Sequence, residues 1–513
     1  MYKLKLILSS VFVVMTLNSW HNNNAIATND VVSRQAGHFV SIDGLWISTP
    51  ETSHTFSSGI FRYVFHFNLD HSGKLTARCV FLLNGKYSSE WRFVNTKYDE
   101  LTRRITLLDE DGNTYEGILD LQNTKITGAI HLKKPMNDVE KTTTNLMRAN
   151  KDLVVTLFYP YIPDLDGSIN YSYQKPEQLD DGIQTASIYA EGVDSLSIIG
   201  LMKEIINQKY GRLESLLILK NDKLIVEEYF YGYNRTQLHN IHSCTKSVTS
   251  LLLGIALERH KNIDIDQSLF SFFPEYDDLK TEEKEQITLK HVLTMTAGFH
   301  DHKGPPEKDK PGDPFRYVLS KPLKTKPGET FKYSNESSDL LGGVIYSLEG
   351  KRADEFAKEY LFGSLGIHKY FWETENGITH CHSDLHLLPR DMAKIGLLVL
   401  NEGKWQKSQI VSKEWIREST KPHVNESKFF DYGYQWWHRS GNNLQWWKEP
   451  NTVSPKEHDL ITALGAGGQY IMIIRDLNLV VVTTASDYDI GKKARSKIPM
   501  VIEKVVPALL YTR

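Results

Sequence analysis

A serine and a lysine stand three residues apart at the start of an apolar stretch. Ser243 and Lys246 lead into the run Leu251-Leu252-Leu253-Gly254-Ile255-Ala256. Residues three apart are neighbours on a helix surface, so a helix here would bring the hydroxyl and the amine together. A serine hydroxyl is a weak nucleophile until a base takes its proton, and burial favours the uncharged, basic form of a lysine. The pair is therefore a candidate nucleophile and base.

The residues after the pair predict a buried helix. Val248, Leu251, Leu252 and Ile255 recur at spacings of three and four, which gives the helix a stripe that faces the core. The free N–H groups and positive dipole end of a helix start would favour negative charge developing beside Ser243.

The same spacing occurs a second time, in Ser172 and Lys175. Pro176 follows at once and biases Lys175 away from helical geometry. We therefore expect the second pair to be chance. Spacing alone does not separate catalysis from the alternative for Ser243, a helix-start serine beside a solvated lysine.

A tyrosine and an asparagine form the second motif. Tyr333-Ser334-Asn335 lies between the turn Lys326-Pro327-Gly328-Glu329 and a predicted helix around residues 340–345. A tyrosine hydroxyl held near the serine and lysine could pass a proton to the leaving group. A packed loop tyrosine is the alternative.

The third motif is Gly465-Ala466-Gly467-Gly468-Gln469, which leads into a predicted strand, residues 470–474. Glycines entering a strand let a substrate approach the backbone closely. We expect an edge strand whose free N–H, with the N–H of Ser243, forms the two-donor oxyanion hole that acyl transfer needs. A glycine bend without a ligand is the alternative.

The three motifs in this order resemble the serine β-lactamase-like hydrolases, nearest the class C-like branch with esterases and 6-aminohexanoate-dimer amidases. The resemblance covers about residues 170–510. Four further stretches that look like the family's connecting sequences carry it too: residues 223–230, 287–298, 388–394 and 432–437.

The resemblance implies a role for each matching residue. Ser243 would be the acylated nucleophile, Lys246 its base, and Tyr333 the group that delivers the proton to the leaving group. Asn335 would orient Lys246 or the substrate. The backbone N–H groups of Ser243 and Gln469 would form the oxyanion hole, and no cofactor is implied.

The third motif departs from the family's pattern. In penicillin-recognising members it starts with lysine or histidine and continues with a hydroxyl residue, and together they bind the substrate's carboxylate. Ala466 and Gly467 offer neither. Losing a charge-assisted contact of this kind costs about 1.5–3 kcal/mol, so we expect an ester or amide without that carboxylate to be the substrate.

Composition sets the frame for these motifs. The chain has 513 residues, 40% hydrophobic and 24% charged, which are globular values and predict two or three domains. A net charge of -3 gives no general reason to expect a nucleic-acid partner. The cysteines, Cys79, Cys244 and Cys381, are odd in number and far apart, so no disulfide framework is expected.

The first residues predict export. Lys3 and Lys5 precede an apolar run, residues 6–17, too short to span a bilayer comfortably, and Ala25-Ile26-Ala27 offers a signal peptidase site. We expect residues 1–27 to be a signal peptide and the mature protein to be periplasmic or secreted, without a membrane span. An uncleaved anchor is the alternative.

Three segments are expected after the signal peptide. Residues 28–150 read as short strands with turn signals such as Asn84-Gly85, which predicts a small all-β barrel or sandwich. Gly44-Leu45-Trp46 faintly resembles the lipocalin opening. Residues 151–194 are expected to be linker and cover. Residues 195–513, with strands near both ends and helices between, are expected to be the serine hydrolase domain.

The predicted fold class is therefore α+β. A β-lactamase/transpeptidase-like domain, an antiparallel sheet flanked by helices with a helical insert, would follow the β-domain. For the β-domain we expect an accessory or partner-binding module, with a ligand-holding barrel as the alternative.

Two histidine-rich stretches raise the question of a metal site. His300-Asp301-His302 and residues 380–386 hold ligand-type side chains, but their spacing matches no known zinc pattern. We expect cleft-wall histidines and no metal. Phe299, Trp436, Trp437, Gly467 and Gly468 are the residues expected to line the cleft, with buried core aromatics as the alternative for the rings.

The resulting hypothesis is an exported serine hydrolase that cleaves a small ester or amide through an acyl-enzyme. A penicillin-binding D-Ala carboxypeptidase or weak β-lactamase is the alternative within the family. A binding module whose hydrolase fold is idle is the alternative of another class.

Overall fold

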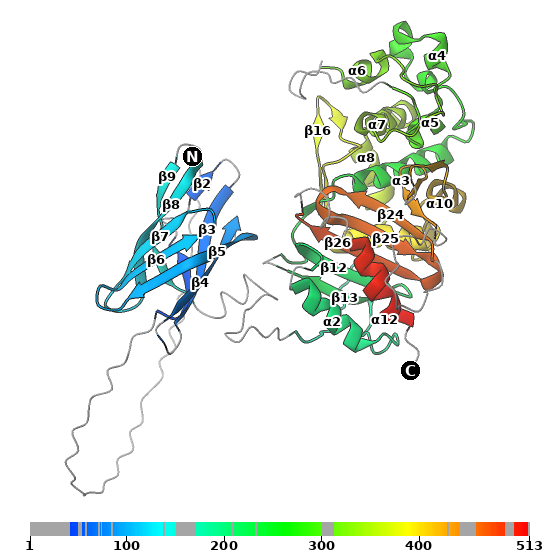
Figure 1. The fold of residues 1–513 in the computed structure, drawn as a ribbon. Helices are drawn as coiled ribbons and strands as arrows, with labels where there is room; N and C mark the ends of the chain where they lie inside the picture. Colours follow the sequence, from blue (N-terminus) through cyan, green and yellow to red (C-terminus); the bar gives the residue numbers. More distant parts are fainter. Residues whose placement is uncertain are drawn as a thin grey trace, which may run out of the picture. The chain divides into compact units, whose positions relative to one another are not determined.

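The computed structural model describes residues 42–49, 54–56, 59–69, 72, 74–83, 86–136, 139–149, 171–206, 209–230, 233–299, 312–427, 430–440, 458–487 and 497–510. The predicted signal peptide, His300-Asp301-His302 and residues 151–170 of the predicted linker lie outside these residues. The N-terminal region and the region from residue 171 onward are described separately (Figure 1).

The N-terminal region is an antiparallel barrel. Its sheet runs in the order β1-β10-β8-β7-β6-β5-β4-β3, and it closes because β1 also pairs with β3. The strands are β1 (Gly44–Ser48), β2 (His54–Phe56), β3 (Gly59–Leu69), β4 (Leu75–Leu83), β5 (Lys86–Asp99), β6 (Arg104–Asp109), β7 (Thr114–Leu119), β8 (Lys125–Met136), β9 (Val139–Thr143) and β10 (Leu146–Arg148). The expected barrel or sandwich is thus a barrel.

Aromatic side chains fill the barrel. Trp46, Phe65, Phe67 and Tyr115 are fully buried there. The Arg148 guanidinium lies 4.6 Å from the centre of the Trp46 ring and donates a hydrogen bond to the Asp43 carbonyl at 2.7 Å. The tryptophan of the G-x-W motif is therefore a packing element that joins the first strand to the last.

A nine-stranded sheet organises the described residues from 171 onward, in the order β11-β13-β12-β26-β25-β24-β23-β22-β21. Its strands are β11 (Gln184–Thr185), β12 (Leu213–Lys220), β13 (Lys223–Tyr229), β21 (Val424–Asn425), β22 (Asp431–Tyr432), β23 (Trp437–Arg439), β24 (Leu460–Gly465), β25 (Gln469–Ile474) and β26 (Leu479–Ala485). The strands β12 and β13 form one hairpin and β25 and β26 another, and β12 pairs with β26. Segments from the two ends of this region therefore share one sheet, as expected (Figure 1).

Helices cover this sheet and form the insert. They are α2 (Ser195–Ile206), α3 (Cys244–Arg259), α4 (Glu282–Glu285), α5 (Leu289–Leu293), α6 (Pro314–Ser320), α7 (Asn335–Glu349), α8 (Ala353–Ala357), α9 (Pro389–Leu400), α10 (Lys413–Thr420), α11 (Lys497–Met500) and α12 (Val506–Leu510). A small sheet has the strand order β14 (His239–Asn240), β18 (Leu385–Leu387) and β15 (Phe371–Trp372), and its strand β14 directly precedes α3 in the sequence. In the described residues no helix has the length and apolar character needed to cross a membrane.

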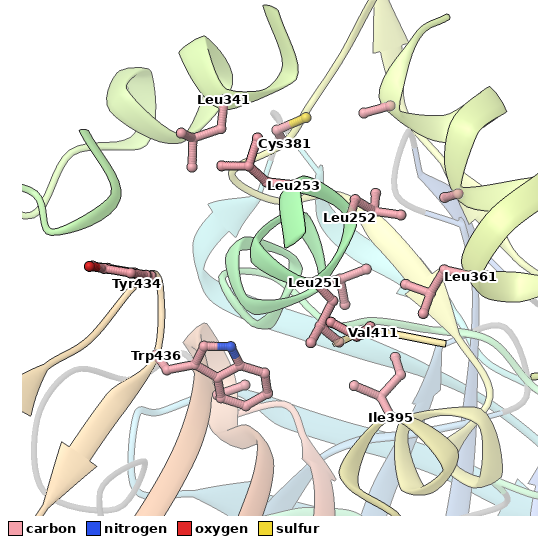
Figure 2. Close-up of a cluster of buried hydrophobic side chains, with 14 of the residues drawn as sticks. Leu251, Leu252, Leu253, Leu341, Leu361, Cys381, Ile395, Val411, Tyr434 and Trp436 are labelled. Carbon is pink, nitrogen blue, oxygen red and sulfur yellow. The ribbon is translucent and has the colours of Figure 1, made fainter. Parts of the chain in front are cut away.

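The helix α3 is the centre of the core. Every residue from Cys244 to Ala256 is buried, so the helix is enclosed on all sides rather than on the single stripe that the sequence predicts. Figure 2 shows Leu251, Leu252 and Leu253 among side chains from the insert and from the sheet side, including Trp436. At Gly254 any Cβ would lie 2.2 Å from the Trp415 ring, so only glycine fits.

Candidate active site

Ser243 stands immediately ahead of α3, at its N-cap position. Its hydroxyl makes no capping hydrogen bond, and its backbone is helical, with φ -65° and ψ -6°. The preceding residue, His242, has a left-handed backbone with φ 47°, and its N–H donates to the Asn240 side chain at 2.8 Å. This sharp turn from β14 into the helix leaves Ser243 partly exposed at the mouth of a buried helix.

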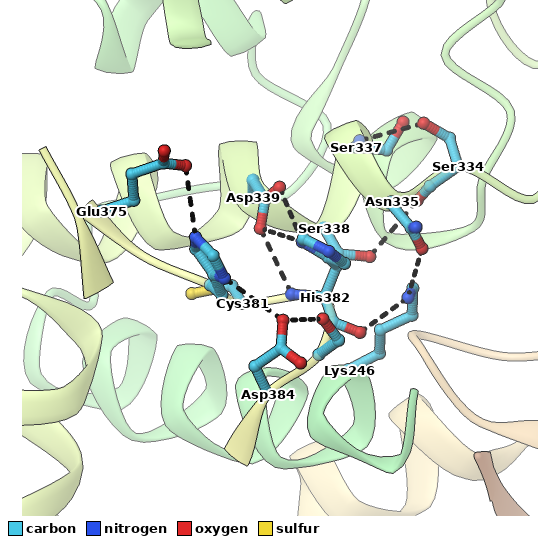
Figure 3. Close-up of polar contacts among 12 residues, drawn as sticks. Lys246, Ser334, Asn335, Ser337, Ser338, Asp339, Glu375, Cys381, His382 and Asp384 are labelled. Carbon is cyan, nitrogen blue, oxygen red and sulfur yellow. Dashed lines mark hydrogen bonds and ion pairs between the residues drawn. The ribbon is translucent and has the colours of Figure 1, made fainter. Parts of the chain in front are cut away.

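Lys246 lies one turn into α3 with 1% of its surface exposed. Its Nζ donates to Ser243 Oγ at 3.3 Å, to Asn335 Oδ1 at 2.8 Å and to the His382 carbonyl at 2.8 Å (Figure 3 shows the last two). All three acceptors are uncharged. Burial lowers the pKa of Lys246 to about 7, against an opposing effect of the Asp339 carboxylate. The amine is therefore close to half neutral at physiological pH.

Tyr333 completes the cluster from the segment just before α7. Its side chain is hydrogen-bonded to Ser243, and burial raises its pKa to about 12. The Lys246 Nζ lies 4.9 Å from the centre of its ring. Ser334 caps α7 by accepting from the Ser337 N–H at 3.1 Å, which makes Asn335 the first residue of the helix rather than a loop residue.

The glycine motif forms a tight turn between β24 and β25. Gly467 and Gly468 have φ values of 79° and 101°, which side chains rarely allow. The turn packs on the start of α3: a Cβ on Gly465 would lie 2.3 Å from the Ile241 carbonyl, and Cys244 Sγ donates to the Gln469 carbonyl at 3.1 Å. The fold thus brings all three sequence motifs to the start of one helix.

Residues 207–499 match the Beta-lactamase family model. The chain belongs to the beta-lactamase family. Among curated proteins, the 6-aminohexanoate-dimer hydrolase of Paenarthrobacter ureafaciens is 22% identical over 293 residues, which cover 53% of this chain and 72% of that protein. The match makes the chain a serine hydrolase by family.

Solved structures agree on the beta-lactamase fold. A putative 6-aminohexanoate-dimer hydrolase from Bacillus anthracis has a TM-score of 0.50 at 21% identity, covering 60% of this chain and 82% of that one. A putative beta-lactamase from Bacteroides dorei has a TM-score of 0.50 at 16% identity, covering 61% and 99%.

The strand β25, which carries Gln469 of the predicted oxyanion hole, is an interior strand of the sheet. β25 lies between β24 and β26 in the sheet, so it is not the edge strand that the sequence argument assumed. The Gln469 side chain is buried and bonded to the backbone of Ala485 in β26. Any donor from this residue is its backbone N–H at the glycine turn, and that role stays a prediction.

The aromatic cleft residues fall into different environments. Trp437 is partly exposed and stacks on Tyr333, with ring centres 5.6 Å apart. Trp436 is fully buried in the core beside α3, so the prediction that it lines the cleft is wrong. Phe299 is partly buried and its backbone bridges to Leu323; its place in a cleft stays a prediction.

The structure adds residues that the motifs did not include. The His382 carbonyl contacts Lys246, and Asp339 contacts His382. The signal available for Asp339 was its position four residues after Asn335, on the same helix face. In the described part of the chain, no group of three His, Cys, Asp or Glu side chains is arranged to hold a metal ion.

Cys244 has a structural position despite its place beside the nucleophile. It is fully buried, and burial raises its pKa well above that of an ordinary thiol. Because the thiolate is the reactive form of cysteine, this residue is a poor competitor for Ser243. Cys79 and Cys381 are buried as well, and neither is part of a disulfide.

Proposed function

We propose that this beta-lactamase-family protein hydrolyses a small carboxylic ester or amide through an acyl-enzyme on Ser243. The observation that carries the proposal is the Lys246 amine, which is buried, touches Ser243 Oγ and has only uncharged hydrogen-bond acceptors. A lysine in such a position can take a proton near neutral pH, which an exposed lysine cannot do efficiently.

The two pKa values support Lys246 as the base. Burial places Lys246 at a pKa of about 7 and Tyr333 at about 12. At pH 7 about half of the lysine is neutral, whereas only about 10⁻⁵ of the tyrosine is ionised. Lys246 is therefore the group that accepts the Ser243 proton, and Tyr333 enters the reaction as a protonated phenol.

The proton then has a short route to the leaving group. As Ser243 Oγ forms a bond to the substrate carbonyl carbon, its proton passes to Lys246. Collapse of the tetrahedral intermediate breaks the bond to the alcohol or amine, which takes a proton from Tyr333 while Lys246 restores the phenol. Water then attacks the acyl-serine by the same groups in reverse.

Backbone donors would stabilise the oxyanion. The N–H of Ser243 belongs to the start of α3, and Gln469 lies beside Cys244 at the glycine turn. Two such donors aimed at one oxygen are worth about 10²- to 10³-fold each in acyl transfer. Both roles are part of the proposal.

The glycine turn also limits the substrate. Ala466 and Gly467 provide no cation and no hydroxyl for a substrate carboxylate. The missing contact corresponds to about 10- to 150-fold in affinity. We therefore place neutral esters and amides ahead of penicillins and D-Ala peptides. From the predicted signal peptide we further propose that the protein acts in a periplasm or outside the cell.

Intact-mass measurement of the protein during turnover tests the proposal. Short p-nitrophenyl esters, the corresponding anilides and a penicillin are each mixed with the protein and quenched at successive times. We expect an acyl adduct from the ester, mapped to the peptide that contains Ser243, and none from the penicillin.

Other outcomes separate the alternatives. A stable penicillin adduct on Ser243 with no ester turnover would favour a penicillin-binding carboxypeptidase or weak beta-lactamase. No adduct and no turnover with any of the three would favour a binding module with an idle site.

A further inference from the structure

The Lys246 amine is held by two acceptors from different segments. One is the Asn335 side chain on α7; the other is the His382 carbonyl, in the connection between β17 (Ile378–Thr379) and β18. A carbonyl in an irregular segment can direct the amine only if the segment itself is fixed. The position of His382 therefore matters to the proposed base.

Asp339 fixes His382 at two points. Its carboxylate accepts a hydrogen bond from the His382 backbone N–H at 3.2 Å and lies 2.8 Å from His382 Nδ1 (Figure 3). Both side chains are mostly buried, with 23% and 19% of their surfaces exposed. One carboxylate thus sets the backbone and the ring of the residue whose carbonyl holds Lys246.

Asn335 and Asp339 act from one helix face. They are four residues apart on α7, so their side chains are neighbours. The first two turns of α7 hold the Lys246 amine twice, directly through Asn335 and indirectly through Asp339 and His382. Because the direct and the indirect contact both come from one capped helix, they set a single position for the amine.

A second carboxylate, that of Asp384, links the same β17–β18 connection to the segment directly before Ser243. Asp384 Oδ1 accepts from the Asn240 side chain at 3.0 Å, and Asp384 Oδ2 lies 3.2 Å from His380 Nδ1. Asn240 in turn accepts from the His242 N–H, directly before Ser243. The β17–β18 connection is therefore held both by α7, through Asp339, and by the segment before α3, through Asn240.

We propose that Asp339 is a positioning residue for the base: through His382 it holds the carbonyl that aims Lys246 at Ser243. This inference rests on the proposed function. Asp339 touches neither Ser243 nor the substrate; it acts on the lysine through His382 and through its charge. The same role would make Asp339 a control on the pH range in which Lys246 is neutral.

The charge effect has a definite sign. Burial lowers the pKa of Lys246, while the negative charges of Asp339 and, less strongly, of Cys244 when ionised and Asp384 oppose that effect. Other titratable groups around the connection are His380, His382, His386, His242, Glu375 and Cys381. Removing the Asp339 charge should move the pKa of Lys246 to a lower value.

Two substitutions separate position from charge. Asp339→Ala removes both grips on His382, and we expect kcat on a p-nitrophenyl ester to fall by about 10²-fold, the effect of a roughly 1 Å misplacement, with KM little changed. Asp339→Asn keeps an oxygen acceptor of the same shape but no charge. We expect it to recover much of kcat and to shift the acid limb of the kcat/KM profile to lower pH.

Glu349→Gln is the matched control. It neutralises a carboxylate at the other end of α7, where Glu349 pairs with Arg259 at 2.9 Å, away from Lys246. It should leave kcat and the acid limb unchanged. Thermal unfolding of each variant shows whether it is folded, and Asp339→Asn, being isosteric, carries the test if Asp339→Ala does not fold.

The outcomes distinguish the two proposals. A folded Asp339→Ala variant with the wild-type kcat would overturn the positioning role, an unmoved acid limb in Asp339→Asn would overturn the charge effect, and either result would leave the proposed function standing. A wild-type protein that forms no acyl-serine would overturn the proposed function itself. A loss of kcat in Asp339→Ala, together with an acid limb shifted to lower pH in Asp339→Asn and unmoved in Glu349→Gln, would support the positioning role.

Discussion

Two serine–lysine pairs of identical spacing, Ser243 with Lys246 and Ser172 with Lys175, fold into opposite surroundings. The first opens a buried helix, and its lysine is 1% exposed. The second lies in the irregular segment before β11, with both side chains exposed. Spacing gives the pair, a helical turn brings its atoms together, and burial changes the chemistry of the amine. The helical turn and the burial are both absent at Ser172.

The largest expected difference between the pairs comes from the lysines. Lys246→Ala removes the only proposed base in contact with Ser243 Oγ among the described residues, and kcat/KM for a p-nitrophenyl ester should fall by about 10³- to 10⁴-fold. Lys175→Ala is the matched control and should leave kcat/KM unchanged. Equal effects of the two substitutions would remove the distinction between the pairs.

A tyrosine accompanies each pair and gives the next test. Tyr333 is hydrogen-bonded to Ser243, whereas the Tyr173 hydroxyl donates to the Ile225 carbonyl at 2.8 Å. Tyr333→Phe removes the proposed proton donor and should lower kcat by about 10²-fold. Tyr173→Phe removes a structural hydrogen bond and should leave kcat near the wild-type value. A wild-type kcat in Tyr333→Phe would take this residue out of the mechanism.

The pH profile gives the smallest but most specific effect. In the proposed mechanism the neutral form of Lys246 is the base. Because burial lowers the pKa of Lys246 to about 7, kcat/KM should be constant well above pH 7. Below pH 7 the amine is protonated, and kcat/KM should fall about tenfold per pH unit. Initial rates on a neutral ester between pH 5 and 9 measure this limb. A profile with no inflection in that range would exclude a lysine of this pKa as the base.

Local patterns were enough to predict much of the fold. The hairpins β12–β13 and β25–β26, the helix α3 and the β-rich start follow from turn signals and periodicity over short stretches. Closure of the barrel does not, because pairing of β1 with β10 joins residues about a hundred positions apart. The extent of burial of α3 also depends on segments that fold over it from both sides.

The candidate site shows the same division. The side-chain types of four residues indicate a chemical role from the sequence alone, and the fold brings these residues together: Ser243, Lys246, Tyr333 and Asn335. The His382 contact is made by a backbone carbonyl, which any residue type supplies, so no sequence signal marks it. The different exposure of Trp436 and Trp437 could have been predicted, since neighbouring side chains in an extended chain point to opposite sides.

The reactivity of the two serine–lysine pairs is compared most directly by mapping where a serine-directed fluorophosphonate reacts. The probe reports an activated serine without requiring the natural substrate, and the two serine–lysine pairs compete within one molecule. We predict one adduct per chain, on Ser243, retained in Ser172→Ala and lost in Ser243→Ala. A folded wild-type protein that forms no adduct, or carries it on Ser172, would contradict the account.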